Sequence, residues 1–107
     1  MAAGVAETAQ HGTRRRVLAL HGELDVAAST SVLKRLIELD LRPGQRLLLD
    51  LRDVQFIDST GIRLLLQARA QAERARAAFT VVAGPPAVMR VLRLVGLDDQ
   101  LDIVDEP

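Results

Sequence analysis

The chain of 107 residues has the length of one compact domain and is too short for two. Its 14 Lys and Arg residues balance 14 Asp and Glu residues, so the formal net charge is zero, which argues against electrostatic wrapping of nucleic acid and against attraction to an anionic membrane. The absence of cysteine excludes disulfides and thiolate chemistry, and an aromatic content of 2% leaves Leu, Val, Ile and Ala to build the core.

The N-terminal residues 1–13 are small and polar, and we expect them to form a tail or a weak edge strand that ends at a turn at His11-Gly12. Residues 1–7 contain neither a basic region nor a long apolar stretch, so we expect no signal peptide. No apolar run approaches the roughly 18 residues that a transmembrane helix needs. His11 and His21 have no Cys or clustered carboxylates beside them, so we expect no metal site. These features predict a soluble, cytoplasmic protein.

The segments up to residue 44 predict a strand and then a helix. Arg16–Leu20 is a short run with a β-branched residue, which is typical of a strand. Gly22-Glu23-Leu24-Asp25 is expected to form a turn, with Asp25 as the N-cap of the following helix. That helix is expected to end before Arg42-Pro43-Gly44. Its apolar face is predicted by helical spacing at Val32, Leu33, Leu36 and Ile37.

The middle of the chain predicts a buried strand and a long helix. Leu47–Leu51 is a near-continuous apolar run, and its length fits a strand buried on both faces. A loop through Asp53 and Gln55 is expected to lead to the segment Phe56-Ile57-Asp58-Ser59-Thr60-Gly61, after which the helix begins. The inner face of this helix is predicted by apolar residues at steps of three and four, namely Ile62, Leu65, Ala68, Ala72 and Ala75.

The C-terminal part predicts a further strand, helix and strand. Phe79–Ala83 is expected to be a strand that Gly84-Pro85-Pro86 ends, and Pro86 is suited to the first turn of the next helix. Gly96-Leu97 resembles a helix C-terminal cap with its hydrophobic partner, and Leu101–Val104 is expected to be a last short strand. The inner stripe of the helix is predicted at Val88, Leu92 and Val95.

The order of these elements predicts the fold class. Strands that alternate with helices indicate βαβ units, which bring parallel pairing and right-handed crossovers. The N-terminal part is the candidate for an added antiparallel strand. We therefore predict an α/β fold with a mixed, mostly parallel β-sheet packed with α-helices, in which residues 14–107 form a single domain.

The segment Phe56–Gly61 carries the main functional signal. Ser59 falls at the start of a helix that follows a buried strand, where unpaired backbone N–H groups and the helix dipole favour an anion. A phosphate on Ser59 would therefore be compatible with the fold. The alternative is that Asp58 or Ser59 only caps the helix.

Other chemistries fit the residues less well. Asp-Ser-Thr-Gly differs by one residue from the spacing of the aspartic protease signature, and those enzymes need two such carboxylates. A hydrolase built from Ser59, His21 and Asp25 would lack the Gly-x-Ser-x-Gly elbow. Arg14-Arg15-Arg16 has no aromatic neighbour for base stacking, so a solvated strand start is favoured over a nucleic-acid site. We therefore expect a protein without enzymatic activity.

Three segments together resemble a known family. They are Gly22-Glu23-Leu24-Asp25 before a helix, then Leu48–Leu51, then Val54-x-Phe56-Ile57-Asp58-Ser59-Thr60-Gly61. These segments are similar to the STAS domain of anti-sigma factor antagonists and of the tails of sulphate transporters. The resemblance covers roughly Val17–Val104. It implies a STAS fold over this stretch and the function of an anti-sigma factor antagonist.

In the antagonists of this family the first hydroxyl residue after the Asp is phosphorylated, which carries over to Ser59. The resemblance implies a partner that is both anti-sigma factor and serine kinase and that uses ATP and magnesium, so the chain itself needs no cofactor. The unphosphorylated form would bind this partner and release the sigma factor, phosphorylation would break the complex, and a serine phosphatase would restore it. The partner-binding residues that the resemblance implies are Glu23, Asp25, Asp58, Thr60, Gly61 and Arg63.

Arg63 is a departure, because family members often have Gly at this position. An arginine four residues after Ser59 shares its helix face and is a candidate partner for a phosphate there. We expect the chain to act as a monomer. The alternative function is a STAS subunit that works without phosphorylation, in a lipid-transport ATPase or in a signalling scaffold.

Overall fold

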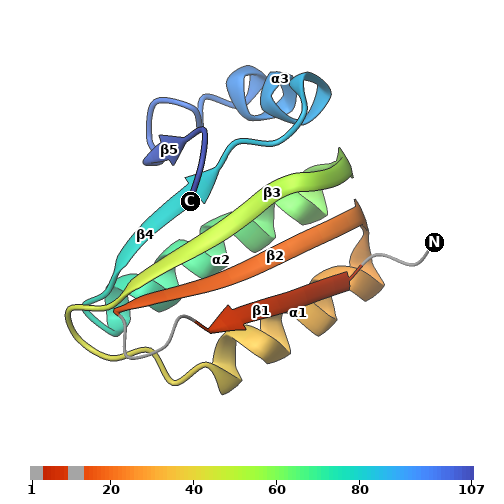
Figure 1. Cartoon of the computed structure of the whole chain (residues 1–107). Coiled ribbons are helices and arrows are strands. Elements are labelled where there is room, and N and C mark those ends of the chain that lie inside the picture. Colours follow the sequence, from red (N-terminus) through yellow and green to blue (C-terminus); the bar gives the residue numbers. More distant parts are fainter. Residues whose placement is uncertain (1–3, 10–13) are drawn as a thin grey trace.

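The computed structural model describes residues 4–9 and 14–107, and for residues 4–9 it describes the backbone alone. Within these residues five strands form one sheet in the order β1-β2-β3-β4-β5 (Figure 1). β1 is antiparallel to β2, and the other neighbouring pairs are parallel. The sheet is therefore mixed and mostly parallel, as the sequence predicts. The strands are β1 (Gly4–Ala9), β2 (Arg15–Leu24), β3 (Arg46–Ile57), β4 (Ala78–Val82) and β5 (Ile103–Val104). The turn expected at His11-Gly12 lies outside the described residues.

The helices are α1 (Val26–Glu38), α2 (Ser59–Arg74) and α3 (Pro86–Leu94). Figure 1 shows α1 and α2 side by side behind the sheet, with α3 beyond the β4 edge. Val88 and Leu92 of α3 are buried and join the same core as α1 and α2. Among the described residues, no helix is both long enough and apolar enough to cross a membrane.

The core between the sheet and the helices is built mostly from leucine. Leu18, Leu49 and Leu64 are fully buried, and they represent the β2, β3 and α2 contributions. Burying such a side chain stabilises the fold by about 1.5–3 kcal/mol, so this layer carries most of the hydrophobic stabilisation. Because the helical face needs only aliphatic side chains, the chain forms this core with almost no aromatic residues.

The opposite face of the sheet carries no helix layer and has a small apolar cluster of its own. Val17, Leu48 and Val82 are buried there in a small cluster, against which Val104 packs. The strand Leu47–Leu51 is therefore buried on both faces, as its unbroken apolar run predicts.

Both central strands are longer than the sequence predicts. The expected turn at Gly22–Asp25 is wrong, because β2 continues to Leu24, and the expected loop through Asp53 and Gln55 is wrong, because β3 continues to Ile57. The β2–β3 register shifts twice, between Ala19 and His21 and between Gly22 and Glu23. Each shift adds a residue to β3, as in a β-bulge, and bulges break the two-residue alternation by which a strand is recognised.

The end of α3 also corrects one prediction. Val95 is 51% exposed and is not part of the inner stripe, because the helix ends at Leu94 and Val95 is its C-cap. Gly96 takes a φ of 77°, the left-handed conformation that ends helices, and the Leu97 N–H donates to the Leu92 carbonyl at 2.9 Å. Leu97 is buried as the hydrophobic partner of this cap, as the sequence predicts.

Candidate functional site

Two helix N-caps meet at one edge of the sheet. β2 and β3 are parallel and end in register, with Glu23 opposite Phe56 and Leu24 opposite Ile57. Asp25 follows directly as the N-cap of α1, and its side chain accepts a hydrogen bond from the Ala28 N–H at 2.9 Å. In the same way Asp58 follows β3 as the N-cap of α2. The two segments that the sequence links by resemblance are therefore neighbours in space.

Asp58 uses the free donors at the start of α2. Its Oδ1 accepts from the Thr60 N–H at 2.9 Å and from the Gly61 N–H at 3.3 Å. These are two of the N–H groups that a helix start leaves without an intrahelical partner. The Asp58 carboxylate thus already occupies two of the donors that favour an anion at this helix start, whereas the compatibility of a phosphate on Ser59 with the fold stays a prediction. Of the two candidate caps, Asp58 is the one that caps the helix.

Ser59 is the first residue of α2 and is exposed, whereas Thr60 is half-buried. Gly61 is buried, and its expected place among the partner-binding residues stays a prediction. A Cβ at Gly61 would lie 2.5 Å from Ile57 Cγ1 and 3.2 Å from Leu24 Cβ. The glycine therefore allows α2 to approach the ends of β2 and β3, and in this way it positions Ser59.

Two large apolar side chains near the ends of β2 and β3 are exposed, and the sequence did not indicate them as partner-binding residues. Phe56 is 50% exposed and Val26 is 69% exposed, although both are large hydrophobic residues. Phe56 lies beside the exposed Glu23 in the strand register, and Val26 is the first residue of α1. We call the exposed residues Glu23, Asp25, Val26, Phe56 and Ser59 the Ser59 surface. Exposed aromatic residues are typical anchors of protein interfaces.

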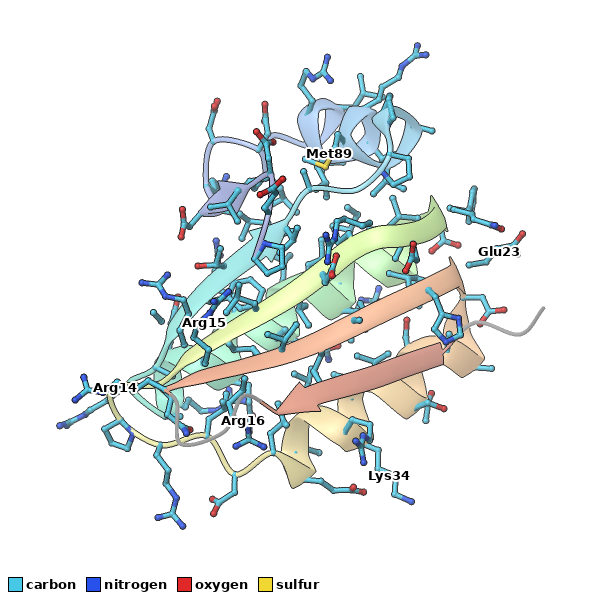
Figure 2. All side chains as sticks on the ribbon, viewed as in Figure 1. Arg14, Arg15, Arg16, Glu23, Lys34 and Met89 are labelled. Atoms are coloured by element: carbon cyan, nitrogen blue, oxygen red, sulfur yellow. The ribbon has the colours of Figure 1, made fainter. Side chains whose placement is uncertain are left out.

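The zero net charge of the chain conceals a separation of charge. Glu23 lies near the ends of β2 and β3, and Arg14, Arg15 and Arg16 lie at the opposite end of β2 (Figure 2). The acidic groups at the Ser59 end are Glu23, Asp25, Asp53 and Asp58. The exposed arginines Arg52 and Arg63 lie at this end as well, so the four carboxylates leave it with a net negative charge, and complementary charge steers encounters with a partner.

Arg63 is exposed on α2 and lies one helical turn after Ser59. Positions four apart on a helix are neighbours on one face, so the guanidinium is within reach of a group on Ser59. It takes part in none of the ion pairs or hydrogen bonds among the described residues. It is thus available to a phosphate or to a partner.

A second polar group lies on the face of the sheet that carries no helices. Asp50 is nearly buried, with 9% of its side chain exposed, and it forms a bidentate ion pair with Arg52, in which Arg52 Nη2 lies 2.8 Å from Asp50 Oδ2 and Nε lies 3.0 Å from Oδ1. The Arg52 N–H also donates to Oδ1. Burial alone raises the pKa of Asp50, but the hydrogen bonds and the charge of Arg52 outweigh it and hold the pKa below its ordinary value.

The structure does not assemble the hydrolase that Ser59, His21 and Asp25 suggested. The Asp25 carboxylate caps α1, whereas His21 lines a separate pocket with Arg52 and Asp53. Within residues 14–107, no group of three or more His, Asp or Glu side chains is placed to hold a metal ion. The site that remains is the Ser59 surface.

The comparisons with known proteins agree with this fold. The family model of the STAS domain matches residues 6–106, so the chain belongs to the STAS family. No curated protein sequence matches the chain.

Solved structures share the fold. An anti-sigma factor antagonist from Mycobacterium paratuberculosis has a TM-score of 0.83 at 23% identity, over 98% of this chain and 87% of that chain. The anti-sigma factor antagonist SpoIIAA in its unphosphorylated form has a TM-score of 0.74 at 22% identity, over 94% of this chain and 90% of that chain. SpoIIAA of Bacillus in the phosphorylated form has a TM-score of 0.62 at 21% identity, over 94% of this chain and 93% of that chain.

Proposed function

We propose that this chain is an anti-sigma factor antagonist whose binding is switched off by phosphorylation of Ser59. The observation that carries the proposal is the exposed Ser59 hydroxyl at the first position of α2, next to the Asp58 cap. Membership of the STAS family and structural likeness to antagonists support it. The partner is an anti-sigma factor with serine kinase activity, which supplies ATP and magnesium, and a serine phosphatase resets the switch. The protein acts in the cytoplasm, as a binding module and not as an enzyme.

The charges around Ser59 explain how a phosphate would act. It adds about −1.5 to −2 charges at neutral pH, beside a carboxylate that already occupies the helix donors. Two unit charges 4 Å apart near a protein surface interact by about 4 kcal/mol before salt screening. A loss of only about 3 kcal/mol weakens binding more than a hundredfold. The switch therefore needs a change of surface charge and no change of fold.

The test separates charge from shape. Ser59→Ala should bind the kinase partner persistently, and Ser59→Asp should bind weakly. Ser59→Asn is the matched control, because it has nearly the shape of Asp without the charge. We expect its affinity to stay near that of Ser59→Ala. Equal affinities for Ser59→Asp and Ser59→Asn would remove the electrostatic mechanism.

Phosphate mapping tests the position of the switch independently. The protein is incubated with its kinase and ATP, and the modified residue is located by mass spectrometry. We expect modification of Ser59 and none of Thr60, because Ser59 is exposed and Thr60 is half-buried. Phosphate on Thr60 with Ser59 unmodified would show that the assignment is wrong.

A further inference from the structure

A pocket of about 670 Å³ lies at the carboxyl ends of β2 and β3, apart from the Ser59 hydroxyl. His21–Gly22 of β2, Arg52–Gln55 of β3 and Pro85, which precedes α3, line it. In open α/β sheets, ligands bind at the carboxyl ends of the strands. The volume falls within the range of about 300–1,000 Å³ that small-molecule sites occupy.

The pocket forms because β3 extends beyond the end of its neighbour β4. β4 ends at Val82, which pairs with Asp50, whereas β3 continues to Ile57. The segment after β4 presses against β3, since a Cβ at Gly84 would lie 2.7 Å from the Leu51 carbonyl oxygen. Pro85 is thereby placed as one wall of the pocket, and the extension of β3 forms the other wall.

The two bulges turn polar side chains of β3 toward solvent. In a regular strand successive residues alternate between faces, but here Arg52 and Asp53 are both exposed, and so is Gln55. Both register shifts of the β2–β3 pair fall within the segments that line the pocket. Bulges commonly re-aim side chains next to binding sites.

Arg52 is held rigidly at this pocket by a nearly buried acid. Its Nε and Nη2 donate to Asp50, and its own N–H donates to the same carboxylate. Nη1 takes part in no hydrogen bond among the described residues, and half of the side chain is exposed. Because its Nε and Nη2 are bound to Asp50, the Arg52 side chain has lost most of its conformational entropy before any ligand binds. It can therefore bind an anion on its free donors at a small entropic cost.

The remaining polar groups specify the ligand further. His21 and Gln55 can donate hydrogen bonds near Arg52, and Asp53 can only accept them when ionised. The hydrogen bonds and the charge of Asp50 raise the pKa of Arg52, and the nearby carboxylates of Asp53 and Glu106 raise it further. A ligand that fits must therefore carry an anionic group for Arg52 and a hydrogen-bond donor for Asp53.

We propose that this pocket binds a small organic anion, with its phosphate or carboxylate group on the Nη1 side of Arg52 and a hydrogen-bond donor on Asp53. The proposal is independent of phosphorylation at Ser59. Nothing in the proposed switch requires it, and its failure would leave that switch untouched.

The test is an NMR titration of the full chain, in which backbone amide shifts locate the bound probe. The probes are inorganic phosphate, phosphoethanolamine and β-alanine, with sodium chloride at matched ionic strength as the salt control. Phosphoethanolamine and β-alanine share an ammonium donor and differ in the anionic group, so they distinguish phosphate from carboxylate. We expect saturable shifts at residues 21–22 and 52–55 with at least one of the two, and none with sodium chloride.

Two variants and a control test the assigned contacts. Arg52→Lys keeps a cation for Asp50 but removes the planar fork, and we expect the affinity to fall about tenfold. Asp53→Asn should weaken phosphoethanolamine and β-alanine, because the carboxylate that attracts their ammonium group is lost, and it should not weaken inorganic phosphate, because a negative charge beside Arg52 is removed. Arg93→Lys, an exposed position on α3 outside the pocket, should change neither. The unfolding midpoint of each variant shows that it remains folded.

Two results would overturn the proposal. One is the absence of saturable shifts at residues 21–22 and 52–55 with both phosphoethanolamine and β-alanine. The other is binding that Arg52→Lys and Arg93→Lys alter to the same extent, because general electrostatic attraction would then explain it.

Discussion

Replacing Gly61 by alanine should destabilise the protein, although alanine is the better helix former. Gly61 lies in the first turn of α2, where an added Cβ would lie 2.5 Å from Ile57 Cγ1 and 3.2 Å from Leu24 Cβ. Neither atom is the free end of a flexible side chain, since Leu24 Cβ is attached to the backbone of β2 and Ile57 is buried at the end of β3. The added methyl group therefore has to push α2 away from the sheet or force Ile57 out of its rotamer.

The expected change in unfolding free energy follows from two opposing contributions. Glycine to alanine in a helix interior gains about 1 kcal/mol of propensity. Overpacking a well-packed core costs about 1–3 kcal/mol, and a contact as short as 2.5 Å belongs at the upper end of that range. We therefore expect Gly61→Ala to lose about 2 kcal/mol of unfolding free energy, which lowers the midpoint of thermal unfolding by about 10 °C in a domain of this size.

Urea unfolding, monitored by circular dichroism, measures the change in unfolding free energy. An unchanged slope of that free energy against urea concentration indicates that the transition is still two-state. Gln67→Gly and Gln67→Ala provide the control, because this exposed position on the same helix reports the propensity term alone. In a double-mutant cycle, Ile57→Ala should cost less in the Gly61→Ala background than in the wild type. A more stable Gly61→Ala variant would refute the close approach of α2 to the sheet.

Three further predictions concern single side chains. Because Arg52 holds the pKa of Asp50 below its ordinary value, this carboxylate contributes stability above its unfolded pKa of about 3.9 and loses it as the pH falls through the lower folded value. Asp50→Asn should thus lower the unfolding free energy by about 1–2 kcal/mol at neutral pH and make it depend less on pH in acid. An unchanged pH dependence of stability in acid would contradict the pairing. Phe56→Ser should weaken partner binding at least about tenfold with little effect on urea unfolding, since half of the ring is exposed; unaltered affinity in calorimetry would exclude it as an anchor. Arg63→Ala should weaken partner binding of the phosphorylated form most, because Arg63 partly neutralises the phosphate, and unchanged affinity and salt dependence in both forms would exclude that role.

Local chemistry made the helix starts predictable. Asp25 and the Asp58 segment are recognisable in the sequence because an N-cap needs only one side chain and the two or three backbone N–H groups that follow it. The cap at Gly96 is predictable for the same reason, since a left-handed residue followed by a buried Leu97 is a local arrangement. Ser59 could be placed at a helix start on this basis before any tertiary contact was known.

Pairing between distant segments made the strand ends unpredictable. β3 continues through Asp53 and Gln55 only because β2 pairs with it across two register shifts, and no residue of β3 alone reveals that partner. The exposure of Phe56 has the same origin, because the second bulge decides which side of the strand its ring occupies. The parts of the site that the sequence missed are therefore those whose direction depends on the β2–β3 register.

The Asp58 cap also explains why a phosphate on Ser59 would act on the surface and not on the fold. A free helix N-terminus attracts an anion, and a phosphate drawn onto the backbone there would be partly neutralised and hidden from a partner. Here the Asp58 carboxylate already accepts from the Thr60 and Gly61 N–H groups, so the phosphate would gain little from the backbone and would be repelled by the cap. Apart from the part that Arg63 neutralises, its charge would remain in solvent on the Ser59 surface, where a docking partner has to desolvate it. An acidic cap directly before the acceptor thus keeps the added charge at the interface.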